Sequence, residues 1–339
     1  MSISLKKKMM ILHVEPDVYD EETRNLLEAV GNVDYVYCNT QAEFNTAVSK
    51  APYNALFLRL GLHADSRILD LLPNLQWIVT PTTGLDHIDL RIAKRRMINV
   101  VSLTGEVEFL NTVWSTAEHT WALLLALMRK IPSNFREVKK GNWKGEPTKD
   151  FMIEELHGKT LGIVGYGRLG RMVAGYGFAF GMKILITDHD VTKLNNNSTD
   201  YENVGLERLL SESDVVSIHL PLNKHTYKII DVNRINLMKN GAILVNTARG
   251  GLIDEQGLLA GLEKGKLSGA GLDVLADEHT WDKRVPEDHP LILYAKKHDN
   301  LILSPHVGGY GRQSIYSTRR FITKKFLAKI QSDGTNTLR

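Results

Sequence analysis

The chain has 339 residues, of which 43% are hydrophobic and 24% are charged, and its formal net charge at pH 7 is +3. This length predicts two domains. The composition excludes a disordered or fibrous chain and is typical of a folded globular protein. The basic residues fall in short runs such as Lys6–Lys8, which we interpret as solvated faces, so no nucleic-acid partner is expected.

Cysteine, histidine and apolar patterns limit the compartment and the kinds of site. The single cysteine, Cys38, cannot form an intrachain disulfide, which fits a reducing compartment and predicts a cytoplasmic protein. The longest apolar stretch, residues 121–128, is far shorter than the roughly 20 residues that span a bilayer, so no membrane partner is expected. Four histidines lack metal-ligand spacing, and we predict structural roles for them and no metal site: His13, His63, His87 and His219.

The first hundred residues alternate short apolar runs with helical patterns. A helix is expected over residues 21–30, and Thr40-x-x-Glu43 is a capping box that opens another. The alternation predicts one parallel-sheet α/β domain, because strands separated by helices form βαβ units. Its expected strands are residues 10–14, 33–37, 55–58, 77–79 and 99–101. None of its βα turns is rich in glycine, so we do not expect dinucleotide phosphates to bind there.

A second βα series begins at Thr160. Before it, residues 116–129 form a strong helical pattern with apolar residues on nearly every face, which predicts a helix buried on several sides. The series predicts a doubly wound, Rossmann-type sheet of six strands. These strands are residues 161–165, 183–187, 215–219, 242–246, 269–272 and 301–304. A last helix is expected over residues 313–330, and we expect it to pack back onto the first domain.

A glycine-rich turn follows the first strand of the second series. Gly165-Tyr-Gly167-Arg168-Leu169-Gly170 lies between an apolar strand and the helical run 171–180. The first glycine permits a tight turn, the second lets the backbone approach a pyrophosphate, and the third lets helix and strand pack closely. Asp188, after the next strand, is placed to accept hydrogen bonds from the adenosine ribose and to repel a 2′-phosphate. The pattern predicts NAD as the cofactor, in preference to NADP.

Three further polar residues follow later strands of the same series. They are Arg249 in a small-residue turn, Glu278 after an apolar strand, and His306 between a proline and glycines. Singly, each has a simpler interpretation: a surface ion pair for the arginine, a solvated acid for the glutamate and a structural histidine. Together they supply a set for hydride chemistry, because the carboxyl ends of parallel strands meet at one edge of a sheet.

The expected roles follow from the chemistry of reducing a ketone. A proton donor must lie beside the carbonyl oxygen, and His306 fits because histidine titrates near physiological pH. Glu278 would fix the tautomer of the imidazole and favour its charged form. Arg249 would bind the substrate carboxylate, because a planar guanidinium can grip a carboxylate with two hydrogen bonds.

Two more motifs extend the pattern: Thr-Gly-Leu-Asp-His-Ile-Asp at residues 83–89 and Thr-Ala-Glu-His at residues 116–119. With the sites above, the chain resembles the D-isomer-specific 2-hydroxyacid dehydrogenases, in the phosphoglycerate dehydrogenase-like group without a regulatory domain. The resemblance implies an NAD-dependent enzyme that interconverts a small D-2-hydroxy acid and its 2-oxo acid. It also places the family's catalytic arginine, glutamate and histidine on Arg249, Glu278 and His306.

The resemblance implies further ligand contacts and a domain layout. A Rossmann NAD domain, residues 108–307, would be inserted into a flavodoxin-like substrate domain made of residues 1–107 and 308–339. Backbone amides in the loop of Thr83, Gly84 and Leu85 would receive the substrate carboxylate. Cofactor contacts are implied at the glycine turn and Asp188, and also at Thr116, Pro221, Thr247, Ala248, Asp273 and Gly308.

Two positions in the first domain restrict the class of substrate that we expect. Arg59 matches an arginine of phosphoglycerate-type members, but Thr80 stands where many of these carry a second arginine. This favours an unphosphorylated polyhydroxy or short-chain acid over a phosphorylated one. The family counterpart of helix 116–128 implies a homodimer with this helix in its interface.

Two alternatives keep the fold. One is an NAD-sensing corepressor that binds protein motifs; the absence of a long disordered tail argues against it. The other is an enzyme for formate or phosphite. Formate-type members usually carry glutamine beside the histidine, and Glu278 argues against this alternative.

Overall fold

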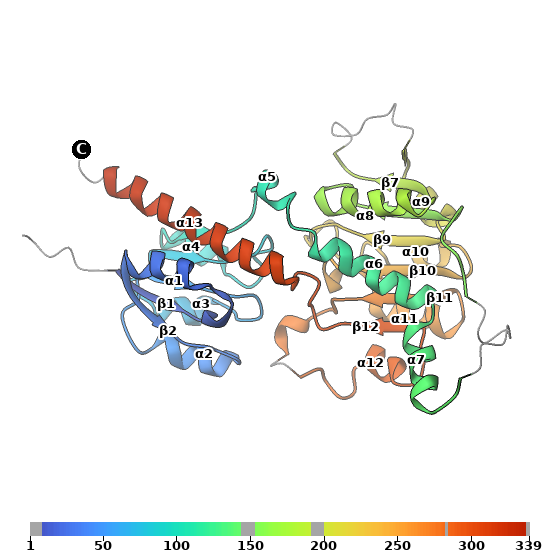
Figure 1. Cartoon of the computed structure of the whole chain (residues 1–339), viewed down its shortest axis with the longest axis horizontal. Coiled ribbons are helices and arrows are strands. Elements are labelled where there is room, and N and C mark those ends of the chain that lie inside the picture. The colour runs from blue at the N-terminus through green and yellow to red at the C-terminus, as the bar shows by residue number, and fades with distance from the viewer. Residues whose placement is uncertain (1–8, 144–152, 191–199, 282–283, 337–339) are drawn as a thin grey trace, which may run out of the picture. The chain divides into compact units, whose positions relative to one another are not determined.

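The computed structural model describes residues 9–143, 153–190, 200–281 and 284–336, and the chain divides into two compact units. Unit 1 is Met1–Thr112 with Gly311–Arg339, and unit 2 is Val113–Tyr310. Figure 1 shows the helices and strands of both units. The assignment of unit 1 to substrate and of unit 2 to cofactor stays a prediction at this point.

Unit 1 is a five-stranded parallel sheet of order β2-β1-β3-β4-β5. This is the flavodoxin-like order, so the predicted fold of the first domain is confirmed. The strands are β1 Met9–His13, β2 Gly31–Tyr35, β3 Ala55–Phe57, β4 Trp77–Val79 and β5 Asn99–Val101. The helices are α1 Glu21–Glu28, α2 Gln41–Val48, α3 Ser66–Asp70, α4 Leu90–Arg95, α5 Val107–Leu110 and α13 Arg312–Asn336, with a 3-10 turn, η1, at Pro16–Val18.

The second strand begins two residues earlier than the apolar pattern predicts. Gly31 pairs with Met9 in the β1–β2 ladder. A Cβ atom on Gly31 would lie 2.5 Å from the Met9 carbonyl oxygen, so a residue without a side chain is needed at this close approach. The predicted capping box of α2 is confirmed, because Thr40 and Glu43 each accept a hydrogen bond from the other's backbone N–H.

Helices cover both faces of the unit 1 sheet. Residues of α2, α3 and α4 pack on one face in a buried cluster with Leu12, Leu56 and Ile78. On the other face lies the long C-terminal helix α13, whose Phe326 contacts Phe57 and Trp77 edge to face, at ring-centroid distances of 5.3 and 5.7 Å. The chain thus returns to unit 1 after completing unit 2.

Unit 2 is a seven-stranded parallel sheet of order β12-β11-β10-β9-β6-β7-β8. If β6 is taken as the first strand, the order is the doubly wound Rossmann order with one further strand, β12, at the edge. The predicted Rossmann fold is confirmed. The strands are β6 Thr160–Val164, β7 Lys183–Thr187, β8 Glu202–Asn203, β9 Val215–Ile218, β10 Ala242–Asn246, β11 Leu267–Leu272 and β12 Leu301–Leu303. The sequence predicted six of them and missed β8, because its two residues are polar and exposed.

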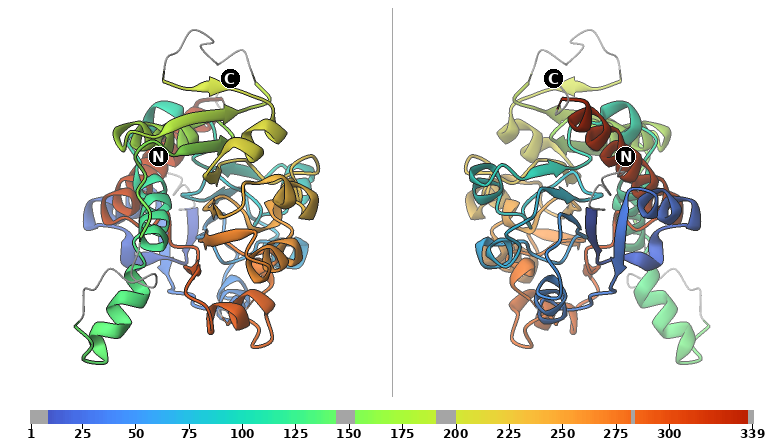
Figure 2. Two further views of the ribbon diagram at one scale, coloured as in Figure 1. Left: turned by 90° about the vertical axis from the view of Figure 1, so that its right-hand side faces the viewer. Right: turned by 90° about the vertical axis from the view of Figure 1, so that its left-hand side faces the viewer.

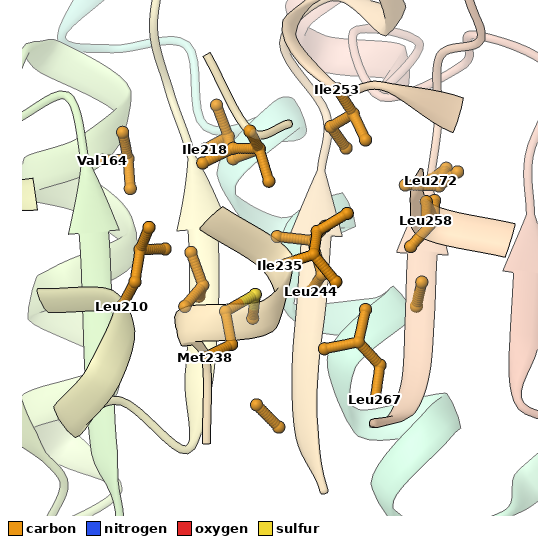
Figure 3. Packing of buried hydrophobic residues seen from close by; sticks show 14 of the residues in the cluster. Val164, Leu210, Ile218, Ile235, Met238, Leu244, Ile253, Leu258, Leu267 and Leu272 are labelled. Atoms are coloured by element: carbon orange, nitrogen blue, oxygen red, sulfur yellow. The ribbon is translucent and has the colours of Figure 1, made fainter. Parts of the chain in front are cut away.

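Two helical layers sandwich the unit 2 sheet. The helices are α6 Ser115–Met128, α7 Ile131–Lys139, α8 Arg168–Ala179, α9 Leu206–Glu212, α10 Val232–Leu237, α11 Glu255–Glu263 and α12 Pro290–Ala295, with 3-10 turns η3 Gly250–Leu252 and η4 Glu278–Thr280. Figure 3 shows one face, where Ile218 and Leu244 of the strands meet Leu210, Ile235 and Leu258 of α9, α10 and α11. Residues of α6 and α8 cover the opposite face.

The all-round apolar helix behaves as predicted, and the next helix does not bury an apolar face. In α6, Ala117, Trp121, Leu124 and Met128 are buried in the cluster with α8 and the sheet. By contrast, α7 has no buried residue and projects from the body of unit 2 (Figure 2). No helix among the described residues is long and apolar enough to cross a membrane.

Candidate active site

The three residues predicted to carry hydride chemistry follow three neighbouring strands. Arg249 comes after β10, Glu278 after β11 and His306 after β12, and these strands are adjacent and parallel in the sheet. The turns after β10 and β11 are also in direct contact. A Cβ atom on Gly250 would lie 2.0 Å from the Leu275 carbonyl carbon, so only glycine fits beside that backbone.

Glu278 and His306 form a hydrogen-bonded pair. The imidazole Nδ1 lies 2.6 Å from Glu278 Oε1, a separation that requires a proton between the two atoms. Both side chains are about three-quarters buried, with exposed fractions of 28% for His306 and 25% for Glu278. The other carboxylate oxygen of Glu278 accepts a hydrogen bond from the Leu275 N–H at 3.3 Å. Because Nδ1–H donates its hydrogen bond to Glu278, Nε2 is the ring nitrogen left for proton exchange.

A buried carboxylate, Asp273, holds the loop that carries His306. Asp273 is 1% exposed, and its oxygens accept hydrogen bonds from the backbone N–H groups of Val307 at 2.9 Å and Gly308 at 2.7 Å. They also accept from the Ser304 hydroxyl at 2.6 Å, and His119 Nε2 lies 3.2 Å away. Burial alone would raise the pKa of Asp273, but the hydrogen bonds from His119, Ser304 and the two amides outweigh it and lower the pKa.

The loop therefore rests on an ionised carboxylate whose two oxygens are both occupied by groups of this chain. Asp273 was expected to contact the cofactor. Its observed hydrogen bonds give it a supporting role for the His306 loop, and a cofactor contact of this residue stays a prediction.

Arg249 lies in a turn that is fixed by its neighbours. The buried Asn246 side chain donates to the Arg249 carbonyl oxygen at 2.8 Å and accepts from the Ala248 N–H at 3.0 Å. The guanidinium donates through Nη1 to the Ala248 carbonyl oxygen at 2.7 Å. Thr247 is tied to α6, because its hydroxyl lies 2.7 Å from the hydroxyl of Thr120.

The glycine turn has the geometry that an incoming anion requires. Gly165 has φ +97°, and a Cβ atom there would lie 2.8 Å from the His219 carbonyl oxygen. At Gly170 a Cβ atom would lie 2.1 Å from the Gly165 carbonyl oxygen. Gly167 faces open space and gives α8 no side-chain cap, so no side chain at this position blocks the approach of an anion to the start of the helix. The helix begins at Arg168 inside the motif, three residues earlier than the predicted run.

The acid predicted to contact the ribose lies against the same turn. Asp188 follows β7 and accepts a hydrogen bond from the Tyr166 N–H at 2.7 Å, which places the carboxylate beside the glycine loop. A second hydrogen bond comes from the Asp190 N–H at 3.0 Å. An open backbone cradle, an uncapped helix terminus and an adjacent carboxylate together fit a dinucleotide.

The other residues implied as cofactor contacts lie around this edge of unit 2. Gly308 approaches the start of α6, since a Cβ atom on it would lie 3.5 Å from Thr116 Cγ2, and its carbonyl oxygen accepts from Ser115. Pro221 is exposed after β9, and its carbonyl oxygen accepts from the Thr226 hydroxyl. Leu169 is half-buried in the first turn of α8.

In unit 1 the residues expected to bind substrate follow β3 and β4. The loop after β4 is braced internally, because the Thr82 hydroxyl donates to the Gly84 carbonyl oxygen and the Thr104 hydroxyl donates to that of Thr83. Within the part of the chain that the structure describes, the N–H groups of Gly84 and Leu85 have no hydrogen-bond acceptor. They are therefore available to an anion.

Arg59, after β3, is engaged with its own surroundings. Its Nε and Nη2 donate to the Cys38 carbonyl oxygen at 3.3 and 2.9 Å, and Nη2 also donates to that of Asn39 at 3.2 Å. Its Nη1 donates to the Leu60 carbonyl oxygen at 3.0 Å. The guanidinium thus bridges the loops after β2 and β3, and little of its donor capacity remains for a ligand.

The sequence interpretation missed three residues that support the site. Asn246 fixes the Arg249 turn, while His119 and Ser304 complete the Asp273 network, with His119 Nε2 and the Ser304 hydroxyl 2.8 Å apart. All three lie inside motifs that the sequence singled out for other reasons. Asn246 is buried and the other two are half-buried, and the available signal was their position within those motifs.

A dinucleotide cradle and a histidine–carboxylate pair at the carboxyl edge of a Rossmann sheet define a nicotinamide-cofactor oxidoreductase fold. Residues 121–308 match the family described as D-isomer specific 2-hydroxyacid dehydrogenase, NAD binding domain. The chain belongs to this family.

Relatives and solved structures agree with this membership. A D-3-phosphoglycerate dehydrogenase of Archaeoglobus fulgidus is 36% identical over 83% of this chain and 52% of its own length, so the chain spans about half of that relative. A glyoxylate reductase of Korarchaeum cryptofilum is 34% identical over 78% of this chain and 76% of its own. A D-lactate dehydrogenase from Aquifex aeolicus, solved with NAD and lactic acid, superposes with a TM-score of 0.82 at 30% identity, covering 96% of each chain.

Proposed function

We propose that this protein is an NAD-dependent dehydrogenase that interconverts a small D-2-hydroxy acid and its 2-oxo acid. The observation that carries the proposal is the 2.6 Å pair of His306 and Glu278 beside the Arg249 turn. These groups match the needs of a ketone reduction: a proton donor, a carboxylate that orients it and a cation for the substrate. The relatives described above support the same chemistry.

The chain's own residues have distinct tasks. Glu278 holds Nδ1 of His306, so that Nε2 gives a proton to the oxo oxygen in reduction and takes it back in oxidation. Arg249 binds the substrate carboxylate with its planar guanidinium. The first amides of α8 and the Asp188 carboxylate hold the dinucleotide. When bound, NADH supplies the hydride.

We propose an unphosphorylated, short substrate. A distal phosphate would need a guanidinium, and Arg59 already donates four hydrogen bonds to loop carbonyl oxygens. Thr80, where many phosphoglycerate-type members carry a second arginine, is fully buried and offers no cation. The structure of unit 1 thus favours an acid whose only anionic group is its carboxylate.

A panel of 2-oxo acids assayed with NADH, followed at the nicotinamide absorbance, tests the activity. We expect turnover of glyoxylate, hydroxypyruvate or pyruvate, and poor turnover of phosphohydroxypyruvate. In Arg59→Ala we expect similar changes in KM for all substrates, because a residue that only supports the loops does not contact the end of the substrate opposite its carboxylate. A selective rise in KM for a phosphorylated acid would contradict the substrate assignment, and no turnover of any oxo acid would contradict the activity.

We also propose a homodimer. The prediction placed residues 116–128 in the interface, and the next helix, α7, exposes apolar side chains: Ile131, Phe135 and Val138 are 56%, 61% and 45% exposed. These three residues recur at helical spacing on one side of a helix that buries none of its residues. A second copy would cover this stripe.

A further inference from the structure

Outside the residues already assigned, a second carboxylate–histidine pair lies close to Glu278. Glu255 is the first residue of α11, and its side chain is 18% exposed. One oxygen, Oε1, accepts a hydrogen bond from the Ala276 N–H at 2.6 Å, and the other, Oε2, lies 3.4 Å from His289 Nε2. His289 precedes α12 and is packed edge to face against Trp281, with an exposed fraction of 11%.

The Ala276 amide belongs to the segment that presents Glu278. Ala276 is two residues before Glu278, and Asp277 between them has φ 57°, a left-handed conformation that costs free energy for a residue with a side chain. This segment lies against Gly250, where a Cβ atom would be 2.3 Å from the Ala276 nitrogen. The Ala276 amide also donates its hydrogen bond to Glu255. The strained turn therefore has contacts with both the Gly250 turn and α11.

We propose that Glu255 is a positioning residue for the Glu278–His306 pair: its carboxylate, held opposite His289, anchors the Ala276 amide and so fixes the turn that places Glu278 against His306. The inference rests on the proposed function for its consequence in turnover. Glu255 itself is none of the residues predicted to bind a ligand. Through this residue, α11 would nevertheless take part in the acid–base step.

The electrostatics favour a dedicated role over a chance contact. Burial raises the pKa of Glu255, and the nearby charges of Asp277 and Glu278 raise it further, while the Ala276 amide and His289 act in the opposite sense. A carboxylate so close to two others is unfavourable unless its hydrogen bonds compensate. An acid that served only to interact with the helix dipole of α11 would do so equally well from the exposed side of the helix, without any effect on turnover.

Three variants of Glu255 separate anchoring from mere stability. Glu255→Gln keeps an oxygen acceptor for the Ala276 N–H, so we expect turnover within about threefold of wild type. Glu255→Ala removes the acceptor, and we expect kcat to fall by about 10- to 100-fold with little change in the dissociation constant of NADH, since the glycine turn is untouched. Glu255→Asp retracts the acceptor by one methylene and should resemble alanine. Glu263→Ala, at the exposed end of the same helix, is the matched control and should leave kcat unchanged.

A double-variant comparison and hydrogen exchange decide the interpretation. If Glu255 acts through Glu278, Glu255→Ala causes no further loss in a Glu278→Ala background. In Glu255→Ala alone, amide exchange measured by mass spectrometry should accelerate in the peptide covering residues 275–278 and stay unchanged in β6 and α8. Losses that multiply in the double variant, or unchanged exchange in that peptide, would overturn the inference.

The same experiment keeps the two proposals apart. If the wild-type protein reduced no 2-oxo acid while exchange still accelerated at residues 275–278, the proposed function would fail and the anchoring by Glu255 would stand. If the wild type were active and Glu255→Ala retained full kcat, the anchoring role would fail and the proposed function would stand.

Discussion

The buried His13 makes the stability of unit 1 depend on pH, and replacing it tests the reasoning quantitatively. His13 ends β1 and is fully buried, with its ring stacked on Phe57 at a centroid distance of 5.1 Å and in edge contact with Tyr19 at 4.2 Å. Burial lowers its pKa to about 3, and the positive charges of Arg24 and Arg319 act in the same direction. The sequence predicted a surface or hydrogen-bonded structural histidine, and Nδ1 does accept a hydrogen bond from the Glu15 N–H at 3.3 Å, while Nε2 has no partner among the described residues.

The size of the effect follows from the two pKa values. The unfolded chain binds a proton at His13 with a pKa of 6.5, whereas the folded chain does so only near pH 3, so stability falls as the pH drops through this window. At pH 5 the unfolded chain is about 1.5 pH units below the pKa of its histidine, while the folded chain stays unprotonated there. Between pH 8 and pH 5 the free energy of unfolding therefore falls by about 2 kcal/mol. Below about pH 3 both states bind the proton and the loss stops growing.

The variant His13→Phe keeps an aromatic ring at this position and removes the titrating group. We expect its unit 1 to lose about 2 kcal/mol less stability than wild type between pH 8 and pH 5, whatever its absolute stability. Hydrogen exchange on peptides of β1 and β3, followed through urea unfolding, reports unit 1 by itself. This matters because His219 in unit 2, whose pKa burial also lowers to about 3, adds its own dependence. Equal losses in wild type and variant would refute the argument.

Three further variants test the site and the proposed dimer. His306→Ala should lower kcat for oxo-acid reduction by about 10²- to 10⁴-fold while NADH still binds, and steady-state kinetics within a few-fold of wild type would remove this residue from the mechanism. Asp188→Ala should weaken NAD binding and relax the preference against NADP, and fluorescence titrations showing both affinities unchanged would count against the ribose contact. If the proposed dimer forms, Phe135→Glu should convert it into a monomer, measured by light scattering at micromolar concentration; a monomeric wild type would contradict the dimer proposal.

Much of the architecture could be predicted because local patterns of apolar and polar residues determine most of the strands and helices. Strands such as Trp77–Val79 and Lys183–Thr187 were predicted with their observed bounds, since continuous apolar runs between helices identify buried parallel strands. The errors fall where tertiary contacts replace the pattern. Gly31 starts β2 because backbone approaches backbone there, and the polar strand Glu202–Asn203 exists because it pairs with β7. Neither contact leaves an apolar signature in the chain.

The candidate site divides in the same way between local and distant determinants. Arg249, Glu278 and His306 can be found from the sequence because each follows a strand within a recognisable turn, and the sheet brings those turns together. The groups that hold them are not local. Glu255 and Ala276 are 21 residues apart in the chain, and His119 and Ser304 are 185 apart, so only the fold shows that they meet. A carboxylate such as Asp273 also has the same sequence signature whether it binds a ligand or supports a loop. The two roles differ in which donors surround its oxygens, and here these donors include the backbone amides of Val307 and Gly308. Residue types and turns thus identify the chemistry, whereas the support of the site depends on hydrogen bonds that the chain forms only when folded.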